Sequence, residues 1–143
     1  MSTPATYDDV NLILRLYELR REERMRAART WFVANFKPKN VEEIARLAPA
    51  GSDENAFYRM TVSYWEMAAS FITSGVLNQE LFFQSGAELL LVYTRVKDLL
   101  PTLRLANHSP AMWKNLETVA LAYIRWWEAK DPEAYQAFAA RVG

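Results

Sequence analysis

The chain has few of the residues on which common catalytic and metal-binding sites depend. It contains no cysteine, one histidine and only four glycines among 143 residues. The lack of cysteine excludes disulfide frameworks, thiol nucleophiles and metal sites with cysteine ligands. It also fits the reducing cytoplasm, which is the location that we expect. Four glycines are too few for the many tight turns of a β-rich protein.

Long apolar runs and a net charge are also missing. No apolar run approaches the roughly 18 residues that a membrane span needs. Polar or charged residues interrupt the stretch Val10–Leu19 at three positions, and no basic region precedes it. We therefore expect neither a membrane span nor a signal peptide. The 17 basic and 17 acidic side chains balance, so nucleic-acid binding is the function that we rank last.

Strong helix formers fill the segments between the turn-forming sequences, and this pattern predicts an all-α fold. We expect one domain over residues 1–143, folded as a bundle of five to seven helices with short connections, with residues 1–6 disordered. The expected helices cover residues 7–36, 41–48, 53–73, 78–83 and 87–100 on either side of Gly86, 110–129, and a last segment from 132.

Capping residues mark the expected helix starts. Thr6, Asn40 and Asn78 can each cap a helix that begins at the following residue. The pairs Ser109–Pro110 and Asp131–Pro132 combine a cap with a proline at the first helical position. Beyond the ends of two helices, a glycine at position 75 and a proline at position 101 are expected stops.

Two helices differ in their expected surroundings. The helix over residues 53–73 carries two adjacent apolar stripes and one narrow polar line, which is typical of a helix in the centre of a bundle. The first helix has a charged middle, Arg20–Arg24, and we expect it to pack at its two ends. Its expected inward positions are Val10, Leu14, Tyr17, Ala28, Trp31, Phe32 and Phe36.

One long segment resembles a known family. The run FYRMTVSYWEMAASFITSGVLNQELFF, residues 57–83, places an aromatic helix with a glutamate before a Gly-Val-Leu-Asn turn and a second amphipathic helix. Together with LPTLR (100–104), MWKNLE (112–117) and DPEAYQAF (131–138), it is similar to an uncharacterised family of bacterial all-helical domains over about residues 57–138. The resemblance implies a helical fold and a bacterial origin. It implies no activity.

The sequence offers little chemistry for an active site. His108 is the single candidate for a proton shuttle near neutral pH, and the polar loop around it indicates an exposed ring. A di-iron bundle needs at least two histidines in Glu-x-x-His pairs. No calcium loop, nucleophile elbow or glycine-rich phosphate loop is present. We therefore predict no catalytic, cofactor-binding or metal-binding residue, and no cofactor.

Three glutamates lie inside apolar stretches, and two interpretations of them remain open. Each can lie on a solvated polar face beside its own ion-pair partner, which we favour, or they can share a buried network with arginines. In a buried network, desolvation would raise the pKa of the carboxyl groups. Aromatic residues nearby can line a pocket between helices. The candidate residues for the pocket or network are Tyr64, Trp65, Glu66, Glu88, Tyr93, Arg95, Glu117 and Tyr123.

Arginines and paired aromatic residues suggest an interaction surface. The charged middle of the first helix carries several arginines, which we interpret mainly as a surface laced with salt bridges. Adjacent aromatic residues on a helix point about 100° apart, so one of each pair approaches either a second packed layer or the surface. The candidate interaction residues are Arg20, Arg21, Arg24, Trp31, Trp126 and Trp127.

These observations rank the functional hypotheses. The leading hypothesis is a non-catalytic helical domain that acts through protein contacts or self-association, as a homodimer. The second is a small-molecule-binding protein with an aromatic pocket between helices. The third is an enzyme that uses only glutamate and arginine, and nucleic-acid binding follows it.

Overall fold

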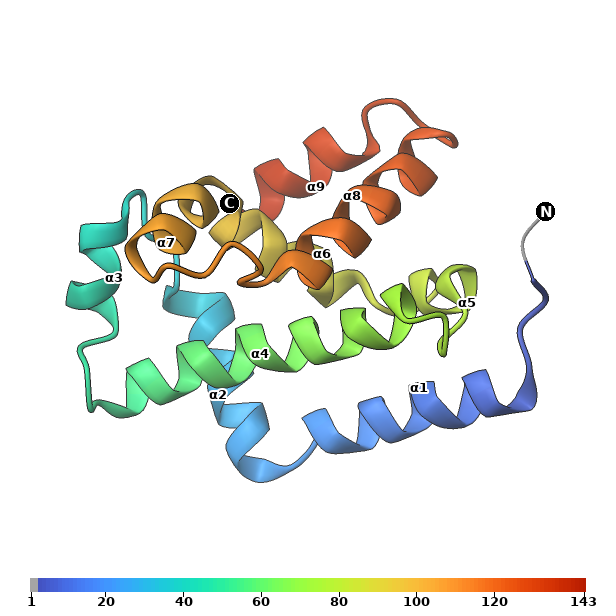
Figure 1. The fold of residues 1–143 in the computed structure, drawn as a ribbon, viewed down its shortest axis with the longest axis horizontal. Coiled ribbons are helices and arrows are strands. Elements are labelled where there is room, and N and C mark those ends of the chain that lie inside the picture. The colour runs from blue at the N-terminus through green and yellow to red at the C-terminus, as the bar shows by residue number, and fades with distance from the viewer. Residues whose placement is uncertain (1–2) are drawn as a thin grey trace.

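The computed structural model describes residues 3–143, and this part of the chain consists of helices joined by turns and short irregular segments (Figure 1). The all-α class is confirmed, and within these residues the segmentation is finer than the expected five to seven helices. The helices are α1 (Tyr7–Arg20), α2 (Glu23–Asn35), α3 (Val41–Leu47), α4 (Asp53–Thr73), α5 (Gln79–Phe83), α6 (Ala87–Val96), a 3-10 turn (Lys97–Leu99), α7 (Leu100–Ala106), α8 (Lys114–Glu128) and α9 (Ala134–Val142).

Three expected N-terminal caps are present. The Thr6 side chain accepts a hydrogen bond from the Asp9 amide at 3.3 Å, and the Asp9 carboxylate accepts one from the Thr6 amide at 2.7 Å, which completes a capping box. Asn40 and Asn78 cap α3 and α5 in the same way, through side-chain oxygens that accept amide protons at 2.9 and 2.8 Å. Each cap satisfies an amide that has no partner inside its helix.

The first residues of the chain precede α1. The prediction of disorder over residues 1–6 falls in part on residues 1 and 2, which lie outside the described residues. The carbonyl of Thr3 accepts a hydrogen bond from the Asn78 side chain at 2.8 Å. Thr6 takes part in the capping box of α1.

The single helix expected over residues 7–36 is wrong, because the chain turns at Arg21 and Glu22. Glu22 has an extended backbone, with a ψ of 144°, and its carboxylate accepts the amide protons of Arg24 and Met25, both at 3.0 Å. A glutamate thus acts as the N-cap of α2. Figure 1 shows α1 and α2 meeting at a corner at this point.

Two expected boundaries in the second half are also wrong. Pro101 lies in the first turn of α7 and does not end a helix, because the first turn needs no amide donor from it. Helix α8 begins at Lys114 and not at Pro110, because Trp113 has a φ of 54° in the left-handed region and interrupts helical geometry. The residues between form turns.

Helix α4 lies in the centre of the fold, as its apolar stripes predicted. It packs against α2 on one side and α8 on the other, and α1 runs along a further side (Figure 1). The buried residues form one hydrophobic cluster that runs from Leu16 on α1 to Phe138 on α9. Trp65 of α4 and Tyr123 of α8 are among its largest fully buried side chains. None of the helices in residues 3–143 combines the length and apolar character that crossing a bilayer requires.

Candidate functional site

Glu66 caps helix α8 from a different helix. The residue at the start of α8, Trp113, makes no capping bond with its own side chain. The Glu66 carboxylate on α4 accepts the Leu116 amide proton at 2.8 Å and the Asn115 side-chain amide at 2.7 Å. A carboxylate is favoured at a helix N-terminus by free amides and by the helix dipole. Glu66 therefore joins α4 to α8.

Glu88 joins four helices through a half-buried ion pair. Arg29 of α2 donates to the Glu88 carboxylate through Nε at 2.8 Å and Nη2 at 3.0 Å, and Trp65 of α4 donates its indole proton to the same group at 3.0 Å. The Nη1 of Arg29 donates to the carbonyl of Arg20, the last residue of α1. The hydrogen bonds to Glu88 raise the pKa of Arg29. The pair holds α1, α2, α4 and α6 together.

Arg95 is buried and its hydrogen-bond partners are backbone carbonyls. Nη1 donates to Phe32 at 3.1 Å and Phe36 at 2.9 Å, Nη2 donates to Val33 at 3.0 Å, and Nε donates to Val142 at 2.6 Å. The first three carbonyls belong to the last turn and the C-cap of α2, where helix geometry leaves most carbonyls without an amide partner and the dipole favours a cation. Burial lowers the pKa of Arg95. This guanidinium caps α2 from α6 and ties both to α9.

Glu117 forms ion pairs with two basic side chains near the start of α8. It lies 3.2 Å from Nη1 of Arg104 and 3.1 Å from Nζ of Lys114. Arg104 also donates through Nε to the Met112 carbonyl at 2.8 Å. Burial opposes ionisation of Glu117, but the hydrogen bond from Lys114 and the charge of Arg104 outweigh it, so its pKa lies below the ordinary value. The group fixes α7 against α8.

The predicted network residues are thus distributed over separate contacts. Each glutamate has its own partners, and among the described residues no hydrogen bond or ion pair joins one of them to another. No group of three or more histidine or carboxylate side chains in residues 3–143 is arranged to hold a metal ion. The predicted pocket aromatics, Tyr64, Trp65, Tyr93 and Tyr123, are all buried in the core. Burial raises the pKa of Tyr123 to about 12.

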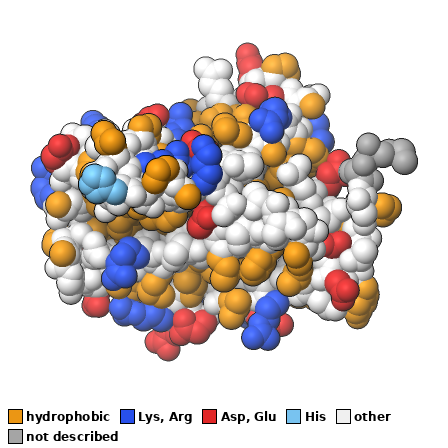
Figure 2. All heavy atoms as spheres, in the orientation of Figure 1, with side chains coloured by type: hydrophobic (Ala, Val, Ile, Leu, Met, Phe, Trp, Pro, Cys, Tyr) orange, Lys and Arg blue, Asp and Glu red, His pale blue; other side chains and the backbone are white. Residues whose placement is uncertain are grey.

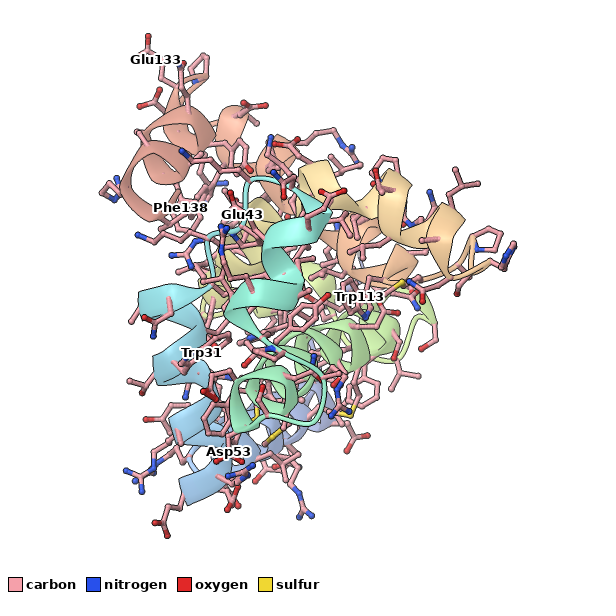
Figure 3. All side chains as sticks on the ribbon, turned by 90° about the vertical axis from the view of Figure 1, so that its left-hand side faces the viewer. Trp31, Glu43, Asp53, Trp113, Glu133 and Phe138 are labelled. Atoms are coloured by element: carbon pink, nitrogen blue, oxygen red, sulfur yellow. The ribbon has the colours of Figure 1, made fainter. Side chains whose placement is uncertain are left out.

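The predicted interaction tryptophans are half-buried against the core. Figure 3 shows Trp31 on α2 beside the start of α4, where its ring centroid lies 6.4 Å from that of Phe57. Trp126 and Trp127 of α8 both pack against Tyr123, and Trp127 also contacts Phe138 of α9. The two neighbouring tryptophans therefore pack on two different sides of α8.

The predicted interaction arginines also have partners within the chain. The guanidinium of Arg24 lies 3.3 Å from Asp53 and covers the Phe57 ring. Arg20 and Arg21 lie 5.2 and 5.4 Å from the Tyr17 ring centroid, and Arg20 also covers Trp65. Arg20 and Arg21 therefore flank the last turn of α1, and Arg24 joins α2 to the start of α4.

His108 lies in the turn that ends α7. It is exposed and has a φ of 50° just after α7. The Ser109 amide donates to the Arg104 carbonyl at 2.9 Å and the His108 amide to Leu105 at 3.2 Å, which is the Schellman pattern at a helix end. Around this turn, an apolar groove of about 530 Å³ is lined by Pro101, Arg104, Leu105, His108 and Pro110.

Helix α1 has an apolar stripe that the domain does not cover. We name it the outer stripe, and its side chains remain 80, 41, 52 and 47% exposed at Tyr7, Val10, Leu14 and Tyr17. The helix contacts the core through other residues, chiefly Leu16. Figure 2 shows hydrophobic side chains along the seam between α4 and α1, where the helix meets the domain.

The expected orientation of α1 is therefore wrong. The sequence placed Val10, Leu14 and Tyr17 inward, whereas Leu12, Ile13 and Leu16 face the core. The sequence feature that bears on this orientation is the presence of two apolar stripes on one short helix. Each stripe fits helical spacing, and the sequence alone does not say which one the domain covers.

Comparison with protein-family models places most of these elements in one family. Residues 5–126, from the start of α1 to near the end of α8, match the model of a domain of unknown function, DUF4760. The match extends the resemblance, which covered about residues 57–138, to the N-terminal helices. No curated protein and no solved structure matches the chain. The chain belongs to the DUF4760 family of domains of unknown function.

Proposed function

We propose that this chain is a non-catalytic helical domain that acts through protein contacts or self-association, and that the outer stripe of α1 is its contact surface. The observation that carries the proposal is the exposure of four large apolar side chains in one row. Their positions, 7, 10, 14 and 17, alternate in steps of three and four. This is the spacing of a seam at which one helix packs against another.

Contacts outside the outer stripe are sufficient to hold α1 against the domain. The helix is already fixed by the buried Leu16, by the bond from the Tyr64 hydroxyl to the Leu16 carbonyl, and by the bond from the Asn78 amide to Asp9 at 2.8 Å. Isolated exposed apolar residues are ordinary, but a contiguous row marks an interaction surface more often.

The charged and polar side chains support a non-catalytic role. Glu66, Glu88, Arg95 and Glu117 all bind helix ends or partners on neighbouring helices. A general acid or base needs a pKa near the working pH, whereas the partners of Glu117 keep its pKa low. An enzyme that uses glutamate and arginine is therefore less well supported than the hypotheses of protein contacts and of small-molecule binding.

Small-molecule binding is the second candidate function. The groove beside α7, with a volume of about 530 Å³, supports it because Pro101, Leu105 and Pro110 give it an apolar lining. A ligand that occupies this groove raises the melting temperature of the protein, and the increase grows with the ratio of ligand concentration to dissociation constant. Substitution of Leu105 by aspartate removes that increase if the groove is the site.

We also propose a cytoplasmic location in a bacterial cell. The lack of cysteine supports the reducing compartment, and the resemblance of residues 57–138 supports the bacterial source. Fractionation of the source cells followed by immunodetection measures the location directly. Recovery of the protein outside the soluble cytoplasmic fraction would contradict this part of the proposal.

Site-specific photo-crosslinking tests the contact surface. Tyr17 is replaced by the photoreactive amino acid p-benzoylphenylalanine in the source cells, which are then irradiated. We expect a discrete crosslinked product of higher mass. The matched control carries the same amino acid at Leu105, which is large, apolar and 79% exposed but lies on α7. Equal yields at both positions, or no product from position 17, would overturn the proposal.

A further inference from the structure

We infer that the pocket between α6, the loop after α2 and the end of α9 binds the phosphate group of a small phosphate monoester. The pocket has a volume of about 470 Å³, and Lys37, Lys39 and Arg95 contribute three cationic side chains to its lining. The end of α9 meets α6 here, where Arg95 donates to the Val142 carbonyl (Figure 1). The pocket shares no residue with the outer stripe of α1, so the inference goes beyond the proposed function.

Arg95 brings a buried positive charge to this pocket without a counter-ion. It is 7% exposed, and among residues 3–143 no carboxylate forms an ion pair with it. Arg29 is in a different situation, because Glu88 raises its pKa, whereas burial lowers the pKa of Arg95. A buried charge is costly unless hydrogen bonds and an opposite charge compensate for it. An anion in the pocket would supply that opposite charge.

The guanidinium of Arg95 retains one proton for a ligand. It has five N–H protons in a planar fork, and it donates four of them to the carbonyls of Phe32, Val33, Phe36 and Val142. The second proton of Nη2 has no acceptor within residues 3–143. The end of α2 carries only about half a negative charge, so these carbonyls offset part of the positive charge. They also fix the orientation of the fork, and a donor that is already oriented loses little freedom when a ligand binds.

Two lysines line the same pocket from the loop between α2 and α3. Lys37 and Lys39 are exposed, and within the described part of the chain neither forms an ion pair. The backbone of the loop is fixed on both sides of them. The Phe36 carbonyl accepts the bond from Arg95 at 2.9 Å, and the Lys39 amide donates to the Glu43 carboxylate at 3.2 Å. Both ammonium groups therefore remain available to a ligand on a well-anchored loop.

The acidic groups beside the pocket do not cancel these charges. Asp98 is 89% exposed, and its carboxylate lies 3.9 Å from Nζ of Lys97, which is its own partner. Gly143 also lines the pocket, but no ion pair joins its end to any of the three cationic side chains. The cations therefore outnumber the acidic groups, and an anionic ligand is the one that fits.

The charge and the size of the pocket indicate a phosphate monoester. A phosphate dianion has several oxygens, which accept charge-assisted hydrogen bonds from one guanidinium and two ammonium groups together. A single carboxylate offers one charge to the same three cations. Pockets of about 300–1,000 Å³ suit small molecules, so a volume of about 470 Å³ leaves room for an organic group beside the phosphate. Pro38 and Leu99 give that group an apolar wall.

Thermal unfolding and an NMR titration test the site with two probes, glycerol 3-phosphate and inorganic phosphate, at constant ionic strength. We expect glycerol 3-phosphate to raise the melting temperature and to shift the backbone amide signals of Lys37, Lys39 and Thr94 together. The double variant Lys37→Gln/Lys39→Gln should bind it at least about tenfold more weakly, because two charge-assisted hydrogen bonds are lost. Arg95 stays unchanged in this variant, since it also caps α2.

The matched control is Arg125→Gln/Lys130→Gln, which removes the same number of charges at exposed positions near the end of α8. General stabilisation by phosphate salts acts on every variant alike, so the difference between the two double variants reports the site. Natural chain that shows no signal shift, or equal affinity in both double variants, would overturn the inference. Equal affinities for the two probes would assign the pocket to the free phosphate ion and so exclude the ester as its specific ligand.

Discussion

At the scale of single residues, several of the polar side chains in apolar surroundings satisfy the ends of helices. Glu66 serves the N-terminus of α8, Arg95 serves the C-terminus of α2, and Asp9 serves α1 and α5 together. An unpaired buried amide or carbonyl costs roughly 1–3 kcal/mol. These contacts therefore contribute to stability where the helices meet.

Asp9 makes part of the stability dependent on pH. The amides of Thr6 and Asn78 donate to its carboxylate and lower its pKa below 3.8. Its contribution is complete above the unfolded pKa and is lost as pH falls through the lower folded value. In Asp9→Asn the amide group cannot accept all of these protons. We expect denaturant unfolding to show a less stable variant at pH 7 and a smaller difference from the natural chain near pH 2.5. An equal difference at both values would contradict this role.

Arg95 is the side chain whose loss we expect to be the most damaging. Arg95→Met keeps much of the apolar stem and removes the guanidinium donors to the four carbonyls. We expect a loss of about 3–5 kcal/mol in the free energy of unfolding, measured by chemical denaturation. The control Arg125→Met, at an exposed position, should change it by less than about 0.5 kcal/mol. Similar losses in both would contradict the capping role.

The sequence indicated Glu66 and Arg95 without their partners. Apolar surroundings drew attention to Glu66, Glu88 and Glu117, but the two interpretations considered only solvent or other side chains. The observed partners of Glu66 and Arg95 are backbone groups 47 to 63 positions away, together with the side chain of Asn115 next to one of them. Helix ends become available as partners only once the helices are assembled, and no local pattern records that assembly.

At the scale of helices, residues with unusual roles set the boundaries that the sequence did not predict. Caps by asparagine and threonine were predictable because short polar side chains favour that position. Glu22 as a cap was not, because glutamate is ordinarily a helix former. Pro101 and Trp113 show the same difficulty. A proline in a first turn looks locally like the end of a helix, and a tryptophan in the left-handed region looks locally like a residue inside one.

Two helix ends use the same Schellman turn with different residues, and this gives a paired prediction. The left-handed position is Gly75 after α4, with a φ of 82°, and His108 after α7, with a φ of 50°. His108→Gly should stabilise the chain by about 1 kcal/mol, because only glycine adopts this region without strain. Gly75→Ala should destabilise it by about 1 kcal/mol.

The open space around Gly75 lets the Gly75→Ala variant report on backbone strain without a steric clash. A Cβ there would meet no atom within 4 Å, so backbone strain is the main expected cause of its loss. Thermal unfolding of both variants measures the effect. Destabilisation by His108→Gly would show that its imidazole, and not its backbone, is what the turn requires.

At the scale of the whole molecule, the chain places a well-covered helix in its centre and an incompletely covered one at its edge. The sequence predicted α4 as central, because a helix that is apolar on most sides has to be covered on most sides. It did not predict the exposed side of α1. Both stripes of α1 suit a buried face, and the domain has room to cover one of them.

The central claim is that the outer stripe of α1 is a contact surface, and self-association is the form of contact that the purified chain alone can test. Sedimentation velocity of the purified chain over a range of concentrations tests it most directly, with Leu14→Asp and Arg15→Asp as matched variants on two sides of α1. We predict that the natural chain and Arg15→Asp reach twice the monomer mass of 16.5 kDa. Leu14→Asp should remain monomeric and folded, with an unchanged helical circular dichroism spectrum, because Leu14 is 52% exposed. A natural chain that stays monomeric would contradict self-association, and a dimer that persists in Leu14→Asp would contradict the outer stripe as its surface.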